Sequence, residues 1–473
     1  MDSTQQLPNV LFILADQLCA DALPLFGETQ IQTPHISRLA NGGVSFRNAI
    51  STFPVCTPYR SMLLTGRHPQ TTGHLVNNIC TRHSEISIAD AFAAHGYRTG
   101  YVGKWHLHRG SYPADRSHDW VPAGRDRLGF QFWRAYNHHM VFFDGPISHD
   151  GDWLLTPQYQ DMQWKGYETL AMAGYAREFL EQSSQQPFLL FVSPHQPHST
   201  PFRHAPDEYY ARVPGDLRLP GGCDPSRVPL DSYRKYLAMV LAIDDMVGII
   251  VADLRRLGLL DNTLIVFTSD HGTQLGRHGI RFWDKRSPYE ESIRVPLILH
   301  QPDRLPGGRW RDALTAPVDL FPSLCGLCGV SIPCTVEGHD LSPAWLGREG
   351  AFEPEAVLTM NFSADYGCLQ NGREWRGVRT RRHSYARWLD SRVVLYDLQA
   401  DPREANNLAG QTAQAELEAR MESLLMTLLA ARSDRFEPAL AYRSWFDDQR
   451  RVVRNAFGPL PHPESQPDWS LLS

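Results

Sequence analysis

Three short apolar runs, far apart in the chain, constrain the fold more than any other feature of the sequence. They are residues 9–14, 187–192 and 263–268. Because they are continuous rather than alternating with polar residues, each is expected to be a strand buried on both faces. Segments with helical spacing lie at 34–39, 86–95 and 233–257, and 97–103 has the pattern of a further strand. This alternation predicts an α/β fold with a large, mainly parallel sheet sandwiched by helices.

The pattern changes near residue 350. Segments 376–380 and 392–398 alternate as antiparallel strands do, and 412–432 carries apolar residues on one helical face. We expect an α/β domain over residues 1–350 and a C-terminal subdomain over 351–473, with a smaller antiparallel sheet, an amphipathic helix and a tail. The tail, from Ser444 onward, has no clear period, and we expect it to wrap an edge of the fold or reach a neighbouring subunit.

The composition is that of an ordinary globular protein, with 42% hydrophobic and 21% charged residues among 473. The formal net charge of −6 gives no electrostatic case for binding nucleic acid. No apolar run approaches the roughly 18 residues of a membrane span. The first six residues lack the charged and apolar blocks of a secretory signal. We therefore expect a cytoplasmic protein without nucleic-acid or membrane partners.

Eight cysteines are scattered without the spacing of a disulfide framework, which fits a reducing compartment. They are Cys19, Cys56, Cys80, Cys223, Cys325, Cys328, Cys334 and Cys368. Cys325 and Cys328 have the spacing of a metal knuckle or a redox pair. Both would lie, however, on one apolar face of a helix that starts near Val318, so we favour packing in the core over zinc.

A cysteine, a proline and an arginine occur at fixed spacing in the run 56–60, before an apolar helical segment that ends in Thr-Gly-Arg. A nucleophile at the start of a helix faces free backbone N–H groups and the positive end of the helix dipole, which favours an anionic ester. Arg60, one turn after Cys56, is placed to hold the oxygens of the nucleophile. The same spacing also occurs by chance, and a buried cysteine is commonly only a small hydrophobic residue.

Polar side chains follow two of the predicted strands. Asp16 and Gln17 follow the first strand, and Asp270 and His271 follow the strand at 263–268. Because open α/β sheets keep their sites at the carboxyl edge, we expect these four residues to meet there around one divalent metal ion. By itself the Asp-His-Gly run at 270–272 also fits a capped turn after a strand.

Three further blocks join these motifs. They are 103–107 (Gly-Lys-Trp-His-Leu), 193–198 (Ser-Pro-His-Gln-Pro-His) and 284–296 around Lys285. The six blocks together resemble the type I, formylglycine-dependent sulfatase family of the alkaline-phosphatase-like superfamily. They occur in the family's order and span nearly the whole chain, which is more specific than any single block. The resemblance implies an arylsulfatase-like sulfuric ester hydrolase with its catalytic domain over 1–350.

The resemblance implies that a formylglycine-generating enzyme oxidises Cys56 to Cα-formylglycine. The aldehyde would hydrate to a geminal diol, one hydroxyl of which attacks sulfur and forms a covalent sulfo-enzyme intermediate. His106 would hydrogen-bond the diol and help to remove the proton from its free hydroxyl, so that the intermediate releases sulfate. His195 would protonate the departing alcohol, whereas His198 is expected to be structural.

Three cations and a metal ion complete the implied site. Lys104, Lys285 and Arg60 would neutralise the oxygens of the transferring group. The implied metal ligands are Asp16, Gln17, Asp270, His271 and an oxygen of modified Cys56. We expect the ion to be Ca²⁺, ahead of Mn²⁺ or Mg²⁺.

The sequence departs from the family pattern at the metal site and beside the nucleophile. The family usually has two adjacent aspartates at 16–17 and often Asp-Asn at 270–271, so this chain resembles the phosphonate monoester hydrolase and choline-sulfatase branches. Tyr59 stands where members commonly carry serine or alanine. A less anionic site suits singly charged groups, so hydrolysis of phosphonate monoesters or phosphodiesters is the alternative function. A protein in which Cys56 stays a thiol, without this chemistry, is a third possibility.

Several residues are candidates for contact with the substrate. Those after the nucleophile helix are Asn77, Asn78, Arg82 and His83. Those in an aromatic insertion are Trp133, Tyr136, His138 and His139. Arg281 and Trp283 precede Lys285. Such side chains stack on sugars or aryl rings, but they also anchor ordinary loops. We expect a small-molecule or saccharide sulfate ester as the substrate, and the tail leaves room for a homo-oligomer.

Overall fold

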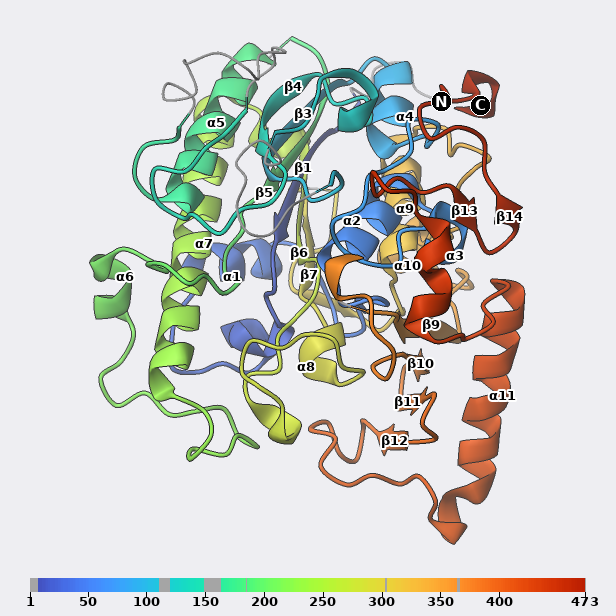
Figure 1. Ribbon diagram of the computed structural model, residues 1–473. Helices are drawn as coiled ribbons and strands as arrows, with labels where there is room; N and C mark the ends of the chain where they lie inside the picture. The colour runs from blue at the N-terminus through green and yellow to red at the C-terminus, as the bar shows by residue number, and fades with distance from the viewer. Residues whose placement is uncertain are drawn as a thin grey trace.

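The computed structural model describes residues 7–109, 120–148, 163–183, 185–302, 304–363 and 366–472 (Figure 1). The first six residues, on which the prediction of a cytoplasmic location partly rests, lie outside these ranges, so that location stays a prediction. Within the ranges, no helix combines the length and the apolar character that crossing a membrane requires.

A large sheet forms the centre of the molecule. Its described strands have the order β4-β3-β5-β1-β6-β7-β2-β8. They are β1 (Asn9–Ala15), β2 (Val44–Phe46), β3 (Arg98–Lys104), β4 (Phe132–Tyr136), β5 (Phe188–Ser193), β6 (Thr263–Ser269), β7 (Leu297–His300) and β8 (Arg309–Arg311). Neighbouring strands are parallel except around β7, which is antiparallel to β6 and β2. The predicted mainly parallel sheet is confirmed.

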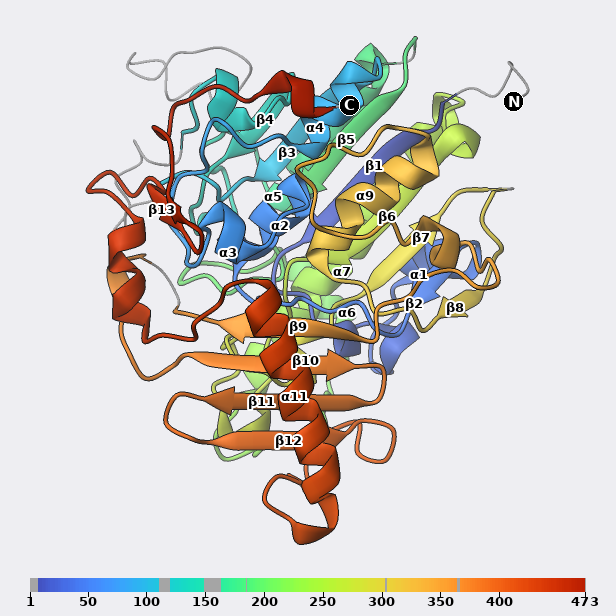
Figure 2. The same cartoon turned by 90° about the vertical axis from the view of Figure 1, so that its right-hand side faces the viewer.

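The side chains of β1 alternate between two helical layers. Leu11 and Ile13 pack in one core with α1, α5 and α7, whereas Val10, Phe12 and Leu14 pack in the other with α2, α4 and α9. The bounds of these helices are α1 (Pro34–Asn41), α2 (Cys56–Thr65), α4 (Ile88–Ala94), α5 (Glu168–Gln182), α7 (Leu230–Arg256) and α9 (Pro317–Cys328). Figure 2 shows α2, α4 and α9 in front of the sheet. Helices cover both sides of the sheet because β1 presents apolar side chains on both faces.

The two cysteines with metal-knuckle spacing belong to the core. Cys325 and Cys328 are 0% and 2% exposed on α9, in the apolar layer that this helix shares with α2. This confirms the prediction of core packing. Seven of the eight cysteines are described as free thiols, and the side chain of Cys368 lies outside the described part of the chain.

A smaller sheet follows residue 350, with the order β12-β11-β10-β9 and all neighbours antiparallel. Its elements are β9 (Ala356–Asn361), β10 (Trp375–Thr380), β11 (His383–Trp388), β12 (Val393–Asp397) and the covering helix α11 (Ala415–Ala431). Met421, Leu425 and Leu429 of α11 are buried on the sheet. Their core also contains Phe53 and Met62, so the small sheet packs directly against the segment that carries α2.

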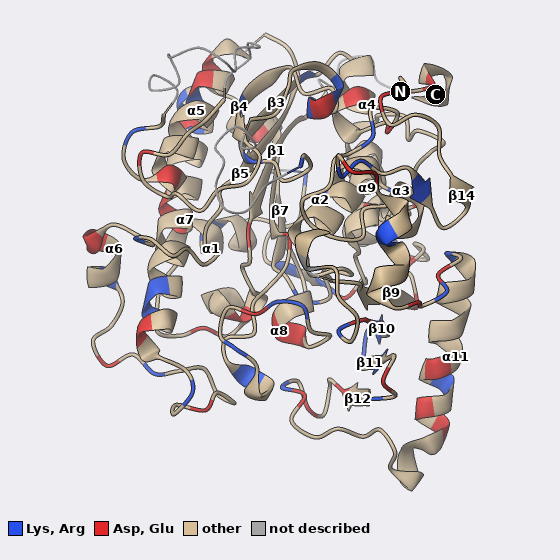
Figure 3. Ribbon diagram, viewed as in Figure 1, with Lys and Arg blue, Asp and Glu red and all other residues tan. Residues whose placement is uncertain are grey.

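The tail returns to the first part of the chain. Backbone N–H groups of Cys80, His83 and Cys334 donate to carbonyl oxygens of Arg450, Pro463 and Leu471, at 2.9, 2.9 and 3.1 Å. These bonds carry the tail along the edge of the fold, which is one of the two predicted courses. Lys and Arg are interspersed with Asp and Glu along the ribbon, including α11 (Figure 3).

Candidate active site

Two strand ends bring the predicted metal ligands together. β1 and β6 are parallel neighbours, so Asp16 and Gln17, after β1, lie beside Asp270 and His271, after β6. The four residues are fully buried. The N–H of Gln17 donates to Oδ1 of Asp270 at 3.1 Å, which joins the two turns. Nδ1–H of His271 donates to the carbonyl oxygen of the next residue at 3.0 Å, so Nε2 carries the lone pair.

Cys56 is the first residue of α2, and its sulfur lies among these groups. Sγ is 3.2 Å from Nε2 of His271 and 4.0 Å from Oδ1 of Asp16. Asn77 fixes the first turn of the helix, because its Oδ1 accepts from the Thr57 N–H at 2.8 Å. A nucleophile at position 56 therefore combines the positive end of a helix with neighbouring carboxylate and imidazole groups.

Arg60 lies one turn along α2 and points beneath the site. Its guanidinium donates to Oδ2 of Asp270 at 3.0 and 3.2 Å and to Oδ2 of Asp16 at 3.2 Å. Its remaining donors bind the carbonyl oxygen of Lys104 at 2.7 Å and Oγ of Ser193 at 2.9 Å. Because these protein acceptors use the guanidinium and the side chain is 1% exposed, the structure gives Arg60 a positioning role instead of the predicted contact with ester oxygens.

Two ammonium groups flank the sulfur. Nζ of Lys104, at the end of β3, is 3.6 Å from Sγ of Cys56, and Nζ of Lys285 is 3.3 Å from it. Lys104 also donates to Oδ2 of Asp16 at 2.5 Å. Burial opposes the ionisation of Asp16, but the charges of Lys104 and Lys285 outweigh it and hold the pKa of this carboxyl well below its usual value.

Two histidines accept hydrogen bonds from these lysines. Nε2 of His195 lies 3.0 Å from Nζ of Lys104, and Nε2 of His198 lies 3.0 Å from Nζ of Lys285. Burial, with the adjacent ammonium charge, lowers the pKa of both imidazoles well below the usual value. Both rings are therefore neutral, and each accepts a hydrogen bond from the adjacent lysine.

A cavity of about 880 Å³ opens over Cys56. Its lining comes from α2, the loop that carries Lys285 and the tail. The lining residues are Val55, Cys56, Asn77, Asn78, His106, His138, Met140, His198, Arg281, Phe282, Trp283, Asp284, Lys285, Arg286, Gly367 and Arg450. A cavity of this size accommodates a molecule much larger than a sulfate group.

Residues 8–330 match the family described as Sulfatase. The chain belongs to the sulfatase family. Residues 276–431 of this sulfatase also match the C-terminal family of N-sulphoglucosamine sulphohydrolase. An ulvan-active sulfatase from Formosa agariphila is 34% identical over 440 residues, which cover 89% of this chain and 81% of that protein.

Solved structures agree with this assignment. A Bacteroides fragilis chain described as a sulfatase has 30% identity and a TM-score of 0.78, over 92% of this chain and 98% of that one. A phosphonate monoester hydrolase from Silicibacter pomeroyi has a TM-score of 0.68 at 22% identity, over 91% and 96%, and shows the shared fold alone. The sulfatase is thus a sulfuric ester hydrolase with an alkaline-phosphatase-like fold.

The buried groups of the sulfatase fit a divalent cation. Ligand atoms of Asp16, Cys56, Asp270 and His271 all lie within 4.8 Å of one another. Gln17 donates through Nε2 to the carbonyl oxygen of Trp283 at 2.8 Å, but its buried Oε1 has no partner within the described residues. Burial and the charge of Asp16 raise the pKa of Asp270 to about 6. A cation would relieve this repulsion and take the unpartnered amide oxygen.

The candidate substrate residues divide into two groups. Asn77, Asn78, His138, Arg281 and Trp283 line the cavity. The other candidates lie elsewhere, which corrects their predicted place, and they are Arg82, His83, Trp133, Tyr136 and His139.

The reasons are local. Arg82 donates to tail carbonyl oxygens, and His83 lies 3.4 Å from Asp126. Trp133 is buried against Trp105, and the rings of Tyr136 and His139 stack on each other at 3.8 Å.

Three cationic or titratable residues line the cavity although the sequence did not predict a role for them there. His198, predicted to be structural, lines the cavity and contacts Lys285. The signal for this is its place in the turn after β5, which ends at Ser193 and also carries His195. Arg286 follows Lys285 directly. Arg450 lies in the aperiodic tail, where no sequence pattern indicated it.

Proposed function

We propose that this sulfatase cleaves a sulfate ester of a saccharide, using Cα-formylglycine at position 56 as the nucleophile. The single observation that carries the proposal is the surroundings of Sγ of Cys56. Two ammonium groups and the imidazole of His271 lie within 3.6 Å of this atom. The sulfur marks where the diol oxygens would lie, and positive charge on both sides suits a sulfuryl group in transfer.

In the proposed reaction, a formylglycine-generating enzyme first oxidises Cys56, and the aldehyde takes up water to give the diol. One hydroxyl attacks sulfur, a new S–O bond forms to residue 56, and the S–O bond to the alcohol breaks. The proton that the departing oxygen takes up is held by the Lys104–His195 pair. This assignment keeps the predicted participation of His195 and supplies the proton that its neutral ring lacks.

His106 is suited to the release of sulfate. Its Nε2 lies 3.1 Å from Oδ1 of Asn78, to which it donates, and its buried Nδ1 has no partner in the described part of the chain. Burial lowers the pKa of the imidazole well below the usual value, so Nδ1 carries a lone pair. In the proposal this atom accepts the proton of the second hydroxyl, the C–O bond to sulfate breaks, and the aldehyde forms again.

We propose Ca²⁺ as the metal ion, with Mn²⁺ and Mg²⁺ as the next choices. Its ligands would be Asp16, Gln17, Asp270, His271 and an oxygen of modified Cys56. When bound there, a divalent cation supplies positive charge to the ester oxygens and favours ionisation of the diol. Arg60 keeps the two carboxylates aligned toward that position.

A saccharide fits the cavity better than a small alkyl sulfate does. The indole of Trp283 offers an apolar face, and the guanidinium groups of Arg281 and Arg286 favour further negative charge on the substrate. The relative from Formosa agariphila is named for activity on ulvan. No observation in the cavity favours the phosphonate or phosphodiester alternative.

The test uses protein produced together with a formylglycine-generating enzyme. The mass of the peptide that contains residue 56 should show loss of sulfur, and sulfate release from ulvan and glycosaminoglycan oligosaccharides should exceed that from 4-nitrophenyl sulfate. A matched phenyl phosphonate monoester serves as the comparison for the alternative. An active enzyme that keeps the thiol, or faster hydrolysis of the phosphonate, would overturn the proposal.

A further inference from the structure

A second group of ligand-type side chains lies outside the active site. His278, Glu291 and Glu404 each place one nitrogen or oxygen within 4.8 Å of the others. The first two belong to the stretch between β6 and the end of α8 (Glu290–Ile293), which also carries Lys285, and Glu404 follows β12. The group therefore joins the segment that carries Lys285 to the segment that follows the C-terminal sheet.

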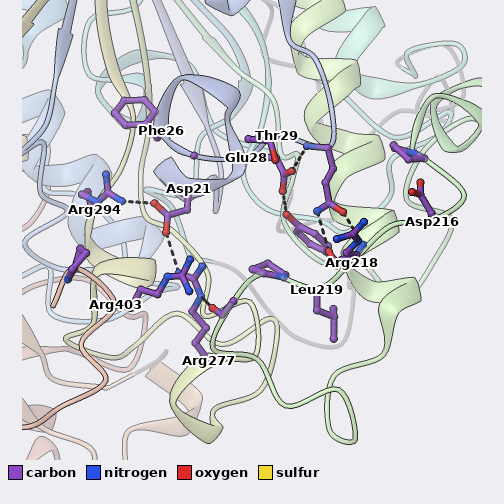
Figure 4. Close-up of a pocket in the computed structure, with 17 residues that line it drawn as sticks. Asp21, Phe26, Glu28, Thr29, Asp216, Arg218, Leu219, Arg277, Arg294 and Arg403 are labelled. Carbon is purple, nitrogen blue, oxygen red and sulfur yellow. Dashed lines mark hydrogen bonds and ion pairs between the residues drawn. The ribbon is translucent and has the colours of Figure 1, made fainter.

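The segments meet beside a neighbouring cavity of about 670 Å³ (Figure 4). Arg277 and Arg403, which precede His278 and Glu404, both line that cavity. Nε of Arg277 donates to the carbonyl oxygen of Gly221 at 2.8 Å, and Nη1 of Arg403 lies 2.4 Å from where a Cβ of Gly221 would be. The segments that carry His278 and Glu404 therefore both contact the backbone at Gly221.

Glu404 stands apart from the ion pairs that surround the group. The acids Asp21, Glu290 and Glu291 form ion pairs with the guanidinium groups of Arg277, Arg294 and Arg379. Among the described residues, Glu404 forms no ion pair, although it is only 2% exposed.

The carboxylate of Glu404 has one oxygen to spare. Oε2 accepts the N–H of Glu290 at 2.7 Å, whereas the buried Oε1 has no partner within the described residues. A buried carboxylate is normally paired with a cation or a metal ion. Glu404 therefore points to a ligand that protein side chains do not supply.

The one short separation within the group, between His278 and Glu291, suits a small metal ion. Nε2 of His278 lies 3.2 Å from Oε2 of Glu291, and bonds of about 2.0–2.2 Å to a tetrahedral ion separate two ligand atoms by about 3.3–3.6 Å. The ring of His278 is held by stacking on Tyr289, with centroids 3.8 Å apart and 5° between the planes. One imidazole and two carboxylates favour zinc over the oxygen-only preference of calcium.

We propose that His278, Glu291 and Glu404 bind one Zn²⁺ ion, separate from the active-site cation. The ion compensates the charge of Glu404 and fastens the loop that carries Lys285 to the segment after β12. Its role is structural, because Glu291 and Glu404 are 3% and 2% exposed and leave little access for a substrate.

The test measures zinc in the full-length protein. Chelator-treated wild type titrated with Zn²⁺ by calorimetry, and checked by elemental analysis after dialysis, is expected to bind one equivalent more than Glu404→Gln does. His278→Ala should lose the same equivalent. Glu416→Gln, an exposed change on α11, is the control and should bind like wild type.

Asp16→Asn separates the two sites. This variant should lose the active-site ion and keep the equivalent that depends on Glu404. Circular dichroism identifies any variant that fails to fold, and His278→Ala then replaces Glu404→Gln. Equal zinc binding by wild type, Glu404→Gln and His278→Ala would overturn the proposal.

Discussion

Nζ of Lys285 lies 3.3 Å from Sγ of Cys56, although the two residues are 229 positions apart in the chain. Nζ of Lys104, which follows Cys56 by 48 positions, lies 3.6 Å from the same sulfur. The chain has four lysines, at 104, 165, 235 and 285, so half of them converge on one atom. Such a concentration is explained by a transferring anion more simply than by stability, since burying ammonium groups is unfavourable.

Replacing Lys285 is expected to impair chemistry more than folding. Lys285→Ala should lower kcat/KM for a sulfate ester by about 10²–10³-fold, because one group that stabilises transition-state charge is lost. Its Nζ contacts only His198 and Cys56 in the hydrogen bonds described, so the unfolding midpoint should change little. Lys165→Ala, an exposed site, is the control. Equal activity of the two variants would contradict the assigned role.

Serine at position 56 should stop turnover after the first half of the reaction. A serine hydroxyl can accept the sulfuryl group, but it lacks the second hydroxyl through which the intermediate breaks down. We expect steady-state activity of Cys56→Ser to fall by about 10³-fold or more. Intact mass measurement after incubation with substrate should show one added sulfuryl group. Repeated turnover at the wild-type rate would refute the proposed exit step.

Arg60 is expected to matter for stability through the carboxylates it holds. Arg60→Ala leaves Asp16 and Asp270 buried without their shared guanidinium, which typically costs about 3–5 kcal/mol. Urea unfolding should show this as a lower midpoint with an unchanged slope. Arg382→Ala removes an exposed ion pair with Asp397 and should unfold like wild type. Equal urea midpoints for the two variants would show that Arg60 does not stabilise the buried carboxylates of Asp16 and Asp270.

Much of the site was accessible from sequence because it depends on strand ends. Asp16 and Asp270 each follow an uninterrupted apolar run, and parallel strands bring such residues to one edge. His195 reaches the same edge of the sheet because it follows β5, which is parallel to β1. The order of the motifs then indicated which helix, α2, would bring Cys56 to that edge.

What sequence did not indicate depends on long-range contacts. Arg82 follows the nucleophile helix closely, yet it turns away because its guanidinium binds carbonyl oxygens of Val452 and Pro461 in the tail. Arg450 reaches the cavity from that same tail. Neither contact follows from a local sequence pattern. The bond from Arg82 to Val452 joins residues 370 positions apart, and Arg450 lies in a segment without periodicity.

Removal of the active-site ion should abolish activity reversibly. Treatment with a chelator is expected to stop sulfate release and to lower Tm, because an ion at 100 times its Kd contributes about 2.7 kcal/mol. Adding Ca²⁺ together with one equivalent of Zn²⁺ should restore both quantities in the wild type. Asp16→Asn should show no rise in Tm with Ca²⁺. Full activity after the ion has been removed, verified by elemental analysis, would contradict the assigned role of the metal.

Glu168 should make stability depend on pH. This residue begins α5, is fully buried, and accepts from the N–H of His195 at 3.2 Å and Nε2 of Gln196 at 3.1 Å. Burial raises the pKa of its carboxyl to about 7. The folded state therefore holds the proton more tightly than the unfolded state, whose pKa is about 4.3.

The stabilising contribution of the protonated Glu168 is fully present below pH 4.3 and is lost as pH rises through about 7. Wild type should consequently lose about 3 kcal/mol relative to Glu168→Gln between these limits, since one pKa unit corresponds to 1.36 kcal/mol. Urea unfolding of both proteins from pH 4.5 to 8 measures the difference. Glu181→Gln, an exposed change on the same helix, should run parallel to wild type. If Glu168→Gln also runs parallel, the buried carboxyl does not hold its proton in the fold, and its hydrogen bonds stabilise the His195 turn in the ionised form.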